Sequence, residues 1–153
     1  MAARDAQDSQ VLFAYDGTDE AKHAIREAAR RLGPGRRCIV LTVWQPFGSH
    51  AMAAGAATWG LVLEDDLGRE AEKVAEEGAR LARSVGFVAT ALARRASPVW
   101  EGIVAAAADH DAGLVVMGTH GRTGFALLLM GSVAAAVAEH ARRAVLILPA
   151  SSP

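Results

Sequence analysis

The stretch that decides the fold runs from Gly118 to Ser132 and reads GTHGRTGFALLLMGS. It follows an apolar run typical of a buried strand, residues 114–117, and leads into a helical run over residues 133–141. Glycines let backbone N–H groups approach a ligand closely, and a helix start adds unpaired N–H donors with positive dipole character. This order of elements therefore predicts a site for a phosphate-bearing ligand.

Length and composition predict one soluble domain. The chain has 153 residues, of which 52% are hydrophobic and 22% charged, as in ordinary globular domains. Its net charge of −1 disfavours nucleic-acid binding through a basic field. The longest nearly apolar run, residues 125–138, has 14 residues, whereas a membrane-spanning helix needs about 20. We expect no membrane contact, a disordered polar tail over residues 1–10 without a signal peptide, and a cytoplasmic location.

Cysteine and histidine usage excludes some metal sites. Cys38 is the only cysteine, so neither an intrachain disulfide nor a cysteine-rich metal site can form. Because Cys38 lies in an apolar run, we interpret it as a buried, inert thiol. The spacing of His23, His50, His110 and His140 forms no metal-ligand cluster.

Strand and helix patterns alternate along the whole chain. Apolar runs predict strands at residues 11–15, 38–44, 87–93, 114–117 and 145–148. Helical spacing predicts a helix from Thr18 as N-cap to Gly33, one from Glu64 to Val85, one with Ser97 as N-cap and Pro98 in the first helical position, and one from Ser132 to about His140. Residues 46–60 are irregular and are the candidate for a mobile loop. The alternation predicts an α/β fold, an open parallel sheet with helices on both faces.

Two strands end in residues suited to ligand binding. Asp16 follows the first strand, and the glycine stretch follows the fourth. In open parallel sheets, ligands bind beyond the carboxyl ends of the strands, where the chain direction across the sheet reverses. Side-by-side placement of these two strands would therefore form a single crevice.

The glycine spacing points to a known family. Gly118-x-x-Gly121, then nine residues, then Gly131-Ser132 resembles the nucleotide-binding signature of the universal stress protein family. Residues 11–17, VLFAYDG, resemble that family's first strand and aspartate turn, and residues 145–148 resemble its final strand. The resemblance covers residues 11–149. It implies one domain over residues 11–150, a Rossmann-like sheet of the adenine nucleotide alpha hydrolase-like type with strand order 3-2-1-4-5, and ATP binding.

The resemblance also implies which residues bind the ligand. Backbone around Ala14 and Asp16, together with Val43, would hold adenine and ribose, and the Asp16 carboxylate would accept a hydrogen bond from a ribose hydroxyl. Met117 and Gly118 would line the ribose and base. The phosphates, with any Mg²⁺ that they carry, would be held by Gly121, Arg122, Gly131, Ser132 and Val133. Tyr15 stands where the family usually has a small or aliphatic residue, so it either points to the opposite face of the sheet or narrows the crevice.

For several side chains the sequence is compatible with more than one role. Asp16 either binds ribose or caps the first helix, and Ser132 acts as a phosphate ligand, as an N-cap, or as both. His120 either meets a phosphate or is simply exposed, and Trp44 either packs in the protein or lies near adenine. The stripe over residues 64–85 fits packing on a sheet better than a coiled coil, for which it has too few heptads.

A regulatory nucleotide-binding protein of the stress response fits these features best. The chain lacks a G-x-x-x-x-G-K-[ST] phosphate loop, a G-x-G-x-x-G fingerprint at the first turn and a G-x-S-x-G nucleophile elbow. The alternatives are slow ATP hydrolysis, with Asp16 or His120 orienting water, cyclic AMP binding, and a purely structural module. Family members commonly dimerise through the final strand, so the resemblance implies a homodimer through Val145, Leu146, Ile147 and Leu148.

Overall fold

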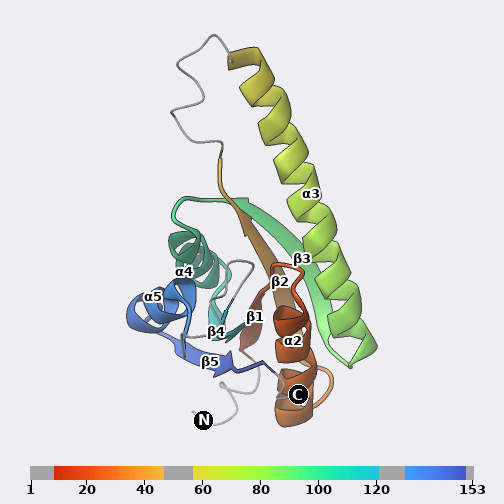
Figure 1. Ribbon diagram of the computed structural model, residues 1–153. Helices are drawn as coiled ribbons and strands as arrows, with labels where there is room; N and C mark the ends of the chain where they lie inside the picture. Colours follow the sequence, from red (N-terminus) through yellow and green to blue (C-terminus); the bar gives the residue numbers. More distant parts are fainter. Residues whose placement is uncertain (1–8, 47–56, 121–129, 151–153) are drawn as a thin grey trace.

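One parallel sheet organises the protein, with strand order β3-β2-β1-β4-β5 (Figure 1). It is seen in a computed structural model that describes residues 9–46, 57–120 and 130–150. The strands are β1 (Gln10–Ala14), β2 (Arg37–Trp44), β3 (Val88–Arg95), β4 (Ala112–Gly118) and β5 (Ala144–Leu148). The helices are α2 (Asp19–Leu32), α3 (Ala57–Ser84), α4 (Val99–Asp109) and α5 (Ser132–His140). The predicted α/β class and strand order are confirmed.

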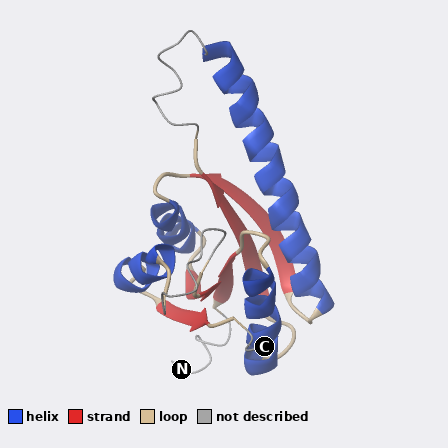
Figure 2. Ribbon diagram, in the orientation of Figure 1, coloured by secondary structure: helices blue, strands red, loops and turns tan. Residues whose placement is uncertain are grey.

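Helices cover both faces of the sheet (Figure 2). Successive side chains of a strand point to opposite faces, and β1 shows this clearly. Val11 and Phe13 pack into the core under α2 and α3, whereas Leu12 packs into the core under α4 and α5. In the register, Val11 lies between Cys38 of β2 and Leu114 of β4. The β1–β4 neighbourhood on which the predicted crevice depends is therefore present.

Helix α3 begins earlier than the sequence pattern predicted. It starts at Ala57 rather than Glu64, so residues 57–60 are helical and not part of an irregular loop. The rest of that candidate loop, residues 47–56, lies outside the described residues. The helix runs beyond the ends of β2 and β3 (Figure 1), and its lower part packs on these two strands. The coiled-coil reading was therefore wrong. Small residues form the buried face, namely Ala71, Ala75, Gly78, Ala79 and Ala82.

Of the N-cap residues predicted from the sequence, only Thr18 is confirmed. Thr18 is the N-cap of α2, and its hydroxyl accepts a hydrogen bond from the Ala21 N–H at 3.2 Å, as expected. Ser97 is not the cap of α4; Pro98 holds that position with an extended backbone (ψ 163°), so the helix begins at Val99. Similarly, Gly131 rather than Ser132 is the N-cap of α5, and Ser132 is its first helical residue.

The strand ends also differ by a few residues. β3 runs to Arg95 rather than residue 93, because it pairs with β2 as far as Trp44. β4 extends from Ala112 to Gly118, and β5 begins one residue early at Ala144, where it pairs with Leu114. Hydrogen bonding to a neighbouring strand extends each of these segments past its apolar run.

The buried thiol is confirmed, and no membrane span is found. Cys38 has no exposed surface, and burial raises the pKa of its thiol to about 12. Of the helices in the described ranges, none combines the length and the apolar character needed to cross a bilayer. The predicted tail over residues 1–10 is wrong at Gln10, which pairs in β1, and residues 1–8 lie outside the described part, where the tail stays a prediction.

The close approach of α3 to the sheet generates a stability prediction. A Cβ at Gly78 would lie 2.7 Å from both Tyr15 Cδ1 and Val40 Cγ1, and overpacking of this kind costs roughly 1–3 kcal/mol. The gain in helix propensity from Gly to Ala is only about 0.5–1 kcal/mol. We therefore expect Gly78→Ala to lower the free energy of unfolding, as measured by urea denaturation.

Gly68→Ala, in the same helix, is the matched control. Its added Cβ would meet Trp44 at an ordinary 3.4 Å, so the propensity gain should leave this variant equally stable or slightly more stable. Equal stability of Gly78→Ala and wild type would show that α3 does not press on Tyr15 and Val40.

Candidate functional site

A cavity of about 740 Å³ opens at the carboxyl ends of β1 and β4. This volume lies within the usual range of small-molecule sites. Most of the predicted binding residues line it, namely Ala14, Tyr15, Asp16, Val43, Met117, Gly118, Gly131, Ser132 and Val133. Gly121 and Arg122, the other two, lie outside the described residues. The structure thus brings the ends of β1, β2 and β4 and the start of α5 around one space.

A backbone hydrogen bond joins the two ends of the glycine stretch, and a second one joins its start to the end of β5. The Gly131 N–H donates to the Thr119 carbonyl at 2.7 Å, and the Thr119 N–H donates to the Leu148 carbonyl at 3.1 Å. A Cβ at Gly131 would lie 2.8 Å from that same Thr119 oxygen, so only glycine fits without a shift. This contact places the N-terminus of α5, with its unpaired N–H groups, at the end of β4.

Asp16 supports the start of α2 from inside the cavity. Its Oδ1 accepts hydrogen bonds from the Thr18 N–H at 3.1 Å and from the Thr18 hydroxyl at 2.6 Å. The carboxylate therefore holds the capping residue, while Thr18 itself makes the cap. Because Asp16 also lines the cavity, the structural role does not exclude the predicted ribose contact.

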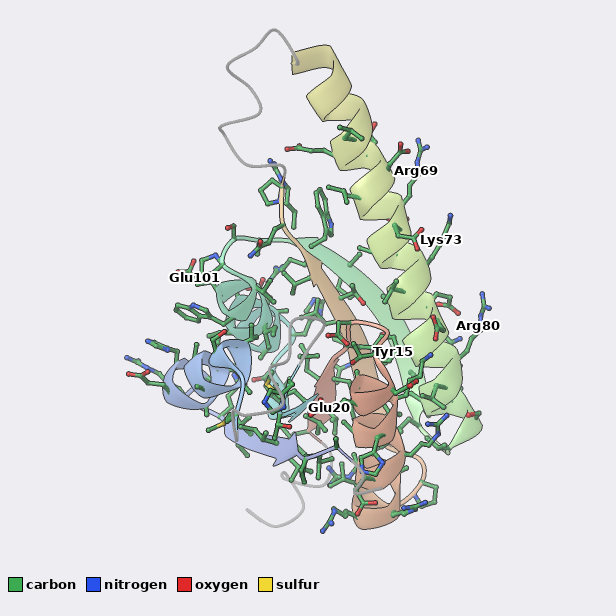
Figure 3. The ribbon with its side chains drawn as sticks, in the orientation of Figure 1. Tyr15, Glu20, Arg69, Lys73, Arg80 and Glu101 are labelled. Atoms are coloured by element: carbon green, nitrogen blue, oxygen red, sulfur yellow. The ribbon has the colours of Figure 1, made fainter. Side chains whose placement is uncertain are left out.

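Tyr15 faces the other side of the sheet. Its ring belongs to the core under α2 and α3 and lies near α3 (Figure 3), although part of the residue lines the cavity. Its hydroxyl donates to Glu77 Oε1 at 3.2 Å. Burial first, and then the Glu77 carboxylate, raise the pKa of the phenol well above its usual range. Tyr15 is therefore a neutral packing residue, which accounts for its departure from the family pattern.

The Glu77 carboxylate interacts with both the Tyr15 hydroxyl and the Lys22 ammonium group. Lys22 Nζ lies 2.9 Å from Glu77 Oε1, and the hydrogen bond from Lys22 is the main reason why the pKa of Glu77 is lowered. Arg69, Lys73 and Arg80, by contrast, point outward from α3 into solvent (Figure 3). The charges of α3 are thus directed away from the cavity, apart from Glu70, which lines it.

The wall formed by α3 was missed by sequence reasoning. Leu67, Ala71 and Val74 line the cavity beside Trp44, whereas their spacing had indicated only packing on the sheet. Trp44 both packs and lines the cavity: a Cβ at Gly68 would lie 3.4 Å from its ring, and the Arg95 guanidinium lies 5.9 Å from the ring centroid. No local sequence pattern identifies these residues as part of a site, because they reach the cavity only through the way in which α3 packs against the sheet.

Glu20 is the second residue that the sequence did not reveal. From the first turn of α2 its Oε1 accepts a hydrogen bond from the His120 N–H at 3.0 Å and another from the Thr119 hydroxyl. A Cβ at Gly118 would lie 2.9 Å from Glu20 Cγ, so glycine at that position makes room for the carboxylate. Sequence reasoning had assigned Glu20 only to the favourable first turn of a helix. Among the described residues, no cluster of His, Cys, Asp and Glu could hold a metal ion.

The chain resembles known proteins over nearly its whole length. A model described as the universal stress protein family matches residues 9–149. The structure is similar to hypothetical protein MJ0577, with 22% identity, a TM-score of 0.80 and coverage of 96% of this chain and 99% of that one. A search of curated proteins gave no match.

Two further solved structures carry adenine nucleotides. A universal stress protein in complex with cAMP has 24% identity and a TM-score of 0.63, covering 94% of this chain and 98% of that one. The universal stress protein from Archaeoglobus fulgidus in complex with dAMP has 21% identity and a TM-score of 0.55, covering 90% and 94%. At these identities the likeness establishes the fold.

The hydrogen bonds of Asp16 lead to a prediction about stability. Asp16→Ala removes the acceptor for both Thr18 hydrogen bonds, and we expect it to lower the free energy of unfolding by about 1–2 kcal/mol. Asp16→Asn keeps an oxygen acceptor and should lose less. Urea denaturation of the three proteins measures this, and equal losses in both variants would contradict the proposed support of Thr18.

Proposed function

Because the chain belongs to the universal stress protein family, we propose that it is a cytoplasmic regulatory protein of the stress response that binds an adenine nucleotide, with ATP as its principal ligand. The observation that carries the proposal is the cavity that runs from Asp16 to the N-terminus of α5. It combines an acceptor for a ribose hydroxyl with a set of backbone donors for phosphate. Two proteins of the same fold are described in complex with cAMP and dAMP, which supports the nucleotide class.

Residues around the cavity fit the parts of such a ligand. Apolar side chains of Val43, Met117 and Ile103 offer a surface for the base. Asp16 lines the cavity as well, and its carboxylate could accept a charge-assisted hydrogen bond from a ribose hydroxyl. Gly131, Ser132 and Val133 form the first turn of α5 and its cap, where phosphate is favoured by both the dipole and the free N–H groups. Because the described residues hold no metal cluster, any Mg²⁺ would arrive with the phosphates.

We favour ATP over a cyclic monophosphate because a chain of phosphates would use more of the backbone donors. Hydrogen bonds to charged groups contribute roughly 1.5–3 kcal/mol each, against an association cost of about 4–15 kcal/mol. Three or four such bonds together with burial of adenine correspond to an affinity in the micromolar range. The regulatory role would follow from occupancy of the site, with ATP hydrolysis at most slow.

A charge placed at the start of α5 tests the proposal. Ser132 is exposed and is the first helical residue, so Ser132→Asp suits the helix dipole and should not destabilise the fold. The same negative charge should repel phosphate and weaken ATP binding by about tenfold or more. Isothermal titration of wild type and variant with ATP, ADP, AMP and cyclic AMP measures both the affinity and the ligand preference.

Ser132→Asn is the neutral control, because asparagine has nearly the same shape as aspartate, and it should bind ATP more tightly than Ser132→Asp does. No heat with any of the four nucleotides would refute nucleotide binding. Equal affinities of Ser132→Asp and Ser132→Asn would instead place the phosphates away from α5.

We also propose that two copies of the chain associate through β5. In the described sheet β5 is an edge strand without a charged side chain, and an apolar edge of this kind tends to pair with another strand. A two-fold axis would align the two strands in an antiparallel manner.

Sedimentation equilibrium tests the assembly. We expect wild type to be a dimer at tens of micromolar, and Val145→Lys to be a folded monomer because lysine discourages edge pairing. Val88→Lys is the control, since Val88 lies on the opposite edge strand, β3, and is 61% exposed. A monomeric wild type would rule out the dimer.

A further inference from the structure

The imidazole of His120 is held in place by a short relay, which is the hydrogen-bonded chain from Glu20 through the Thr119 hydroxyl to the ring. Its Nδ1 lies 3.1 Å from the Thr119 hydroxyl oxygen, and that hydroxyl is hydrogen-bonded to Glu20 Oε1. The same Oε1 accepts the His120 backbone N–H at 3.0 Å and lies 3.8 Å from Nδ1. The side chains of His120 and Glu20 are only 18% and 15% exposed. Ring orientation is therefore fixed from the α2 side.

The relay also fixes the position of the proton on the neutral ring. A carboxylate can only accept hydrogen bonds, so the single proton of the Thr119 hydroxyl goes to Glu20. The hydroxyl oxygen is then the acceptor for Nδ1–H. In the neutral ring this leaves Nε2 without a proton, and its lone pair faces away from the relay.

Nε2 lies on the side of the ring that faces the predicted phosphate site. The atom is buried and has no hydrogen-bond partner among the described residues, an arrangement that calls for an explanation in a native structure. A Cβ at Gly131 would lie 3.8 Å from the neighbouring ring atom Cδ2, so this edge of the ring lies by the cap of α5. His120 and Gly131 both line the cavity.

We propose that His120 contacts a phosphate oxygen of the bound nucleotide through Nε2, and that its ring takes up a proton when the nucleotide binds. This inference rests on the proposed function. A lone pair on Nε2 would repel an anionic oxygen, whereas an N–H at that position donates to it. The conjugate acid of the buffer loses one proton, and its bond to that hydrogen breaks as the N–H bond at Nε2 forms. Glu20 and Thr119 are positioning residues, since they act on the ligand through the ring.

The described charged groups near the ring are acidic. Glu20 approaches from α2, and Asp16 and Glu70 line the same cavity from β1 and α3. No lysine or arginine is present among the described lining residues. β4 and β5 carry no charged side chain, and α5 carries Glu139 and His140 only at its far end. Of the described lining side chains, His120 is therefore the one that can bring positive charge to the phosphates.

Proton uptake during titration measures this directly. We would titrate the full-length protein with ATP in two buffers of different ionisation enthalpy at about pH 7.5, where phosphate groups, with a second pKa of about 6, are already ionised. Wild type should take up a substantial fraction of one proton per ATP. Its affinity should fall as the pH rises, by at most about tenfold per pH unit, the limit for one linked proton.

Matched variants assign the proton to the ring. His120→Gln keeps a neutral donor near the position of Nε2, so it should bind ATP with no proton uptake and no dependence of affinity on pH in this range. Glu20→Gln should reduce the uptake because the negative charge that stabilises the protonated ring is lost. Asp19→Asn, an exposed neighbour in the same turn, should leave uptake unchanged.

The outcomes separate the two proposals. If wild type binds ATP with no proton uptake, or if His120→Gln shows the same uptake as wild type, the role of His120 is overturned while nucleotide binding stands. If wild type binds no nucleotide, both proposals fail. Nitrogen-15 NMR of the wild-type histidine rings provides a check that needs no folded variant: one ring should change from the Nδ1–H form to the doubly protonated form on adding ATP.

Discussion

The hydrogen bond from the Gly131 N–H to the Thr119 carbonyl is the contact on which the site depends. It ties the end of β4 to the start of α5, although eleven residues separate the two partners in the chain. The Thr119 N–H is in turn bound to Leu148 at the end of β5. Three elements thus converge on one residue, Thr119, and the N-terminus of α5 cannot move away from the crevice while these bonds persist.

The site joins the two layers of helices through the sheet. α5 reaches the cavity from one face, whereas Glu20 reaches the same loop from α2 on the other. Gly118 makes this crossing possible, because a side chain there would collide with Glu20. The order of β1 and β4 at the centre of the sheet places both helix starts at the same edge, which is the general location of ligand sites in such folds.

The electrostatics of the cavity are unusual for a site expected to hold phosphates. Its described charged lining residues, Asp16 and Glu70, are both acidic. Among the described lining residues, the groups suited to attract an anion are the backbone dipoles at the start of α5 and, under the proposal made above, the ring of His120.

The sequence by itself determined the class of fold, the ends of β1 and β4 as the edge where the cavity opens, and the capping role of Thr18. These features depend on local patterns, namely apolar runs, turn residues and glycine spacing, each of which is written in consecutive residues. Tertiary structure alone decided that α3 begins at Ala57, that Tyr15 turns toward Glu77, and that Glu20 reaches His120. The last two of these join residues far apart in the chain, and long-range contacts leave no periodic trace in the sequence that forms them.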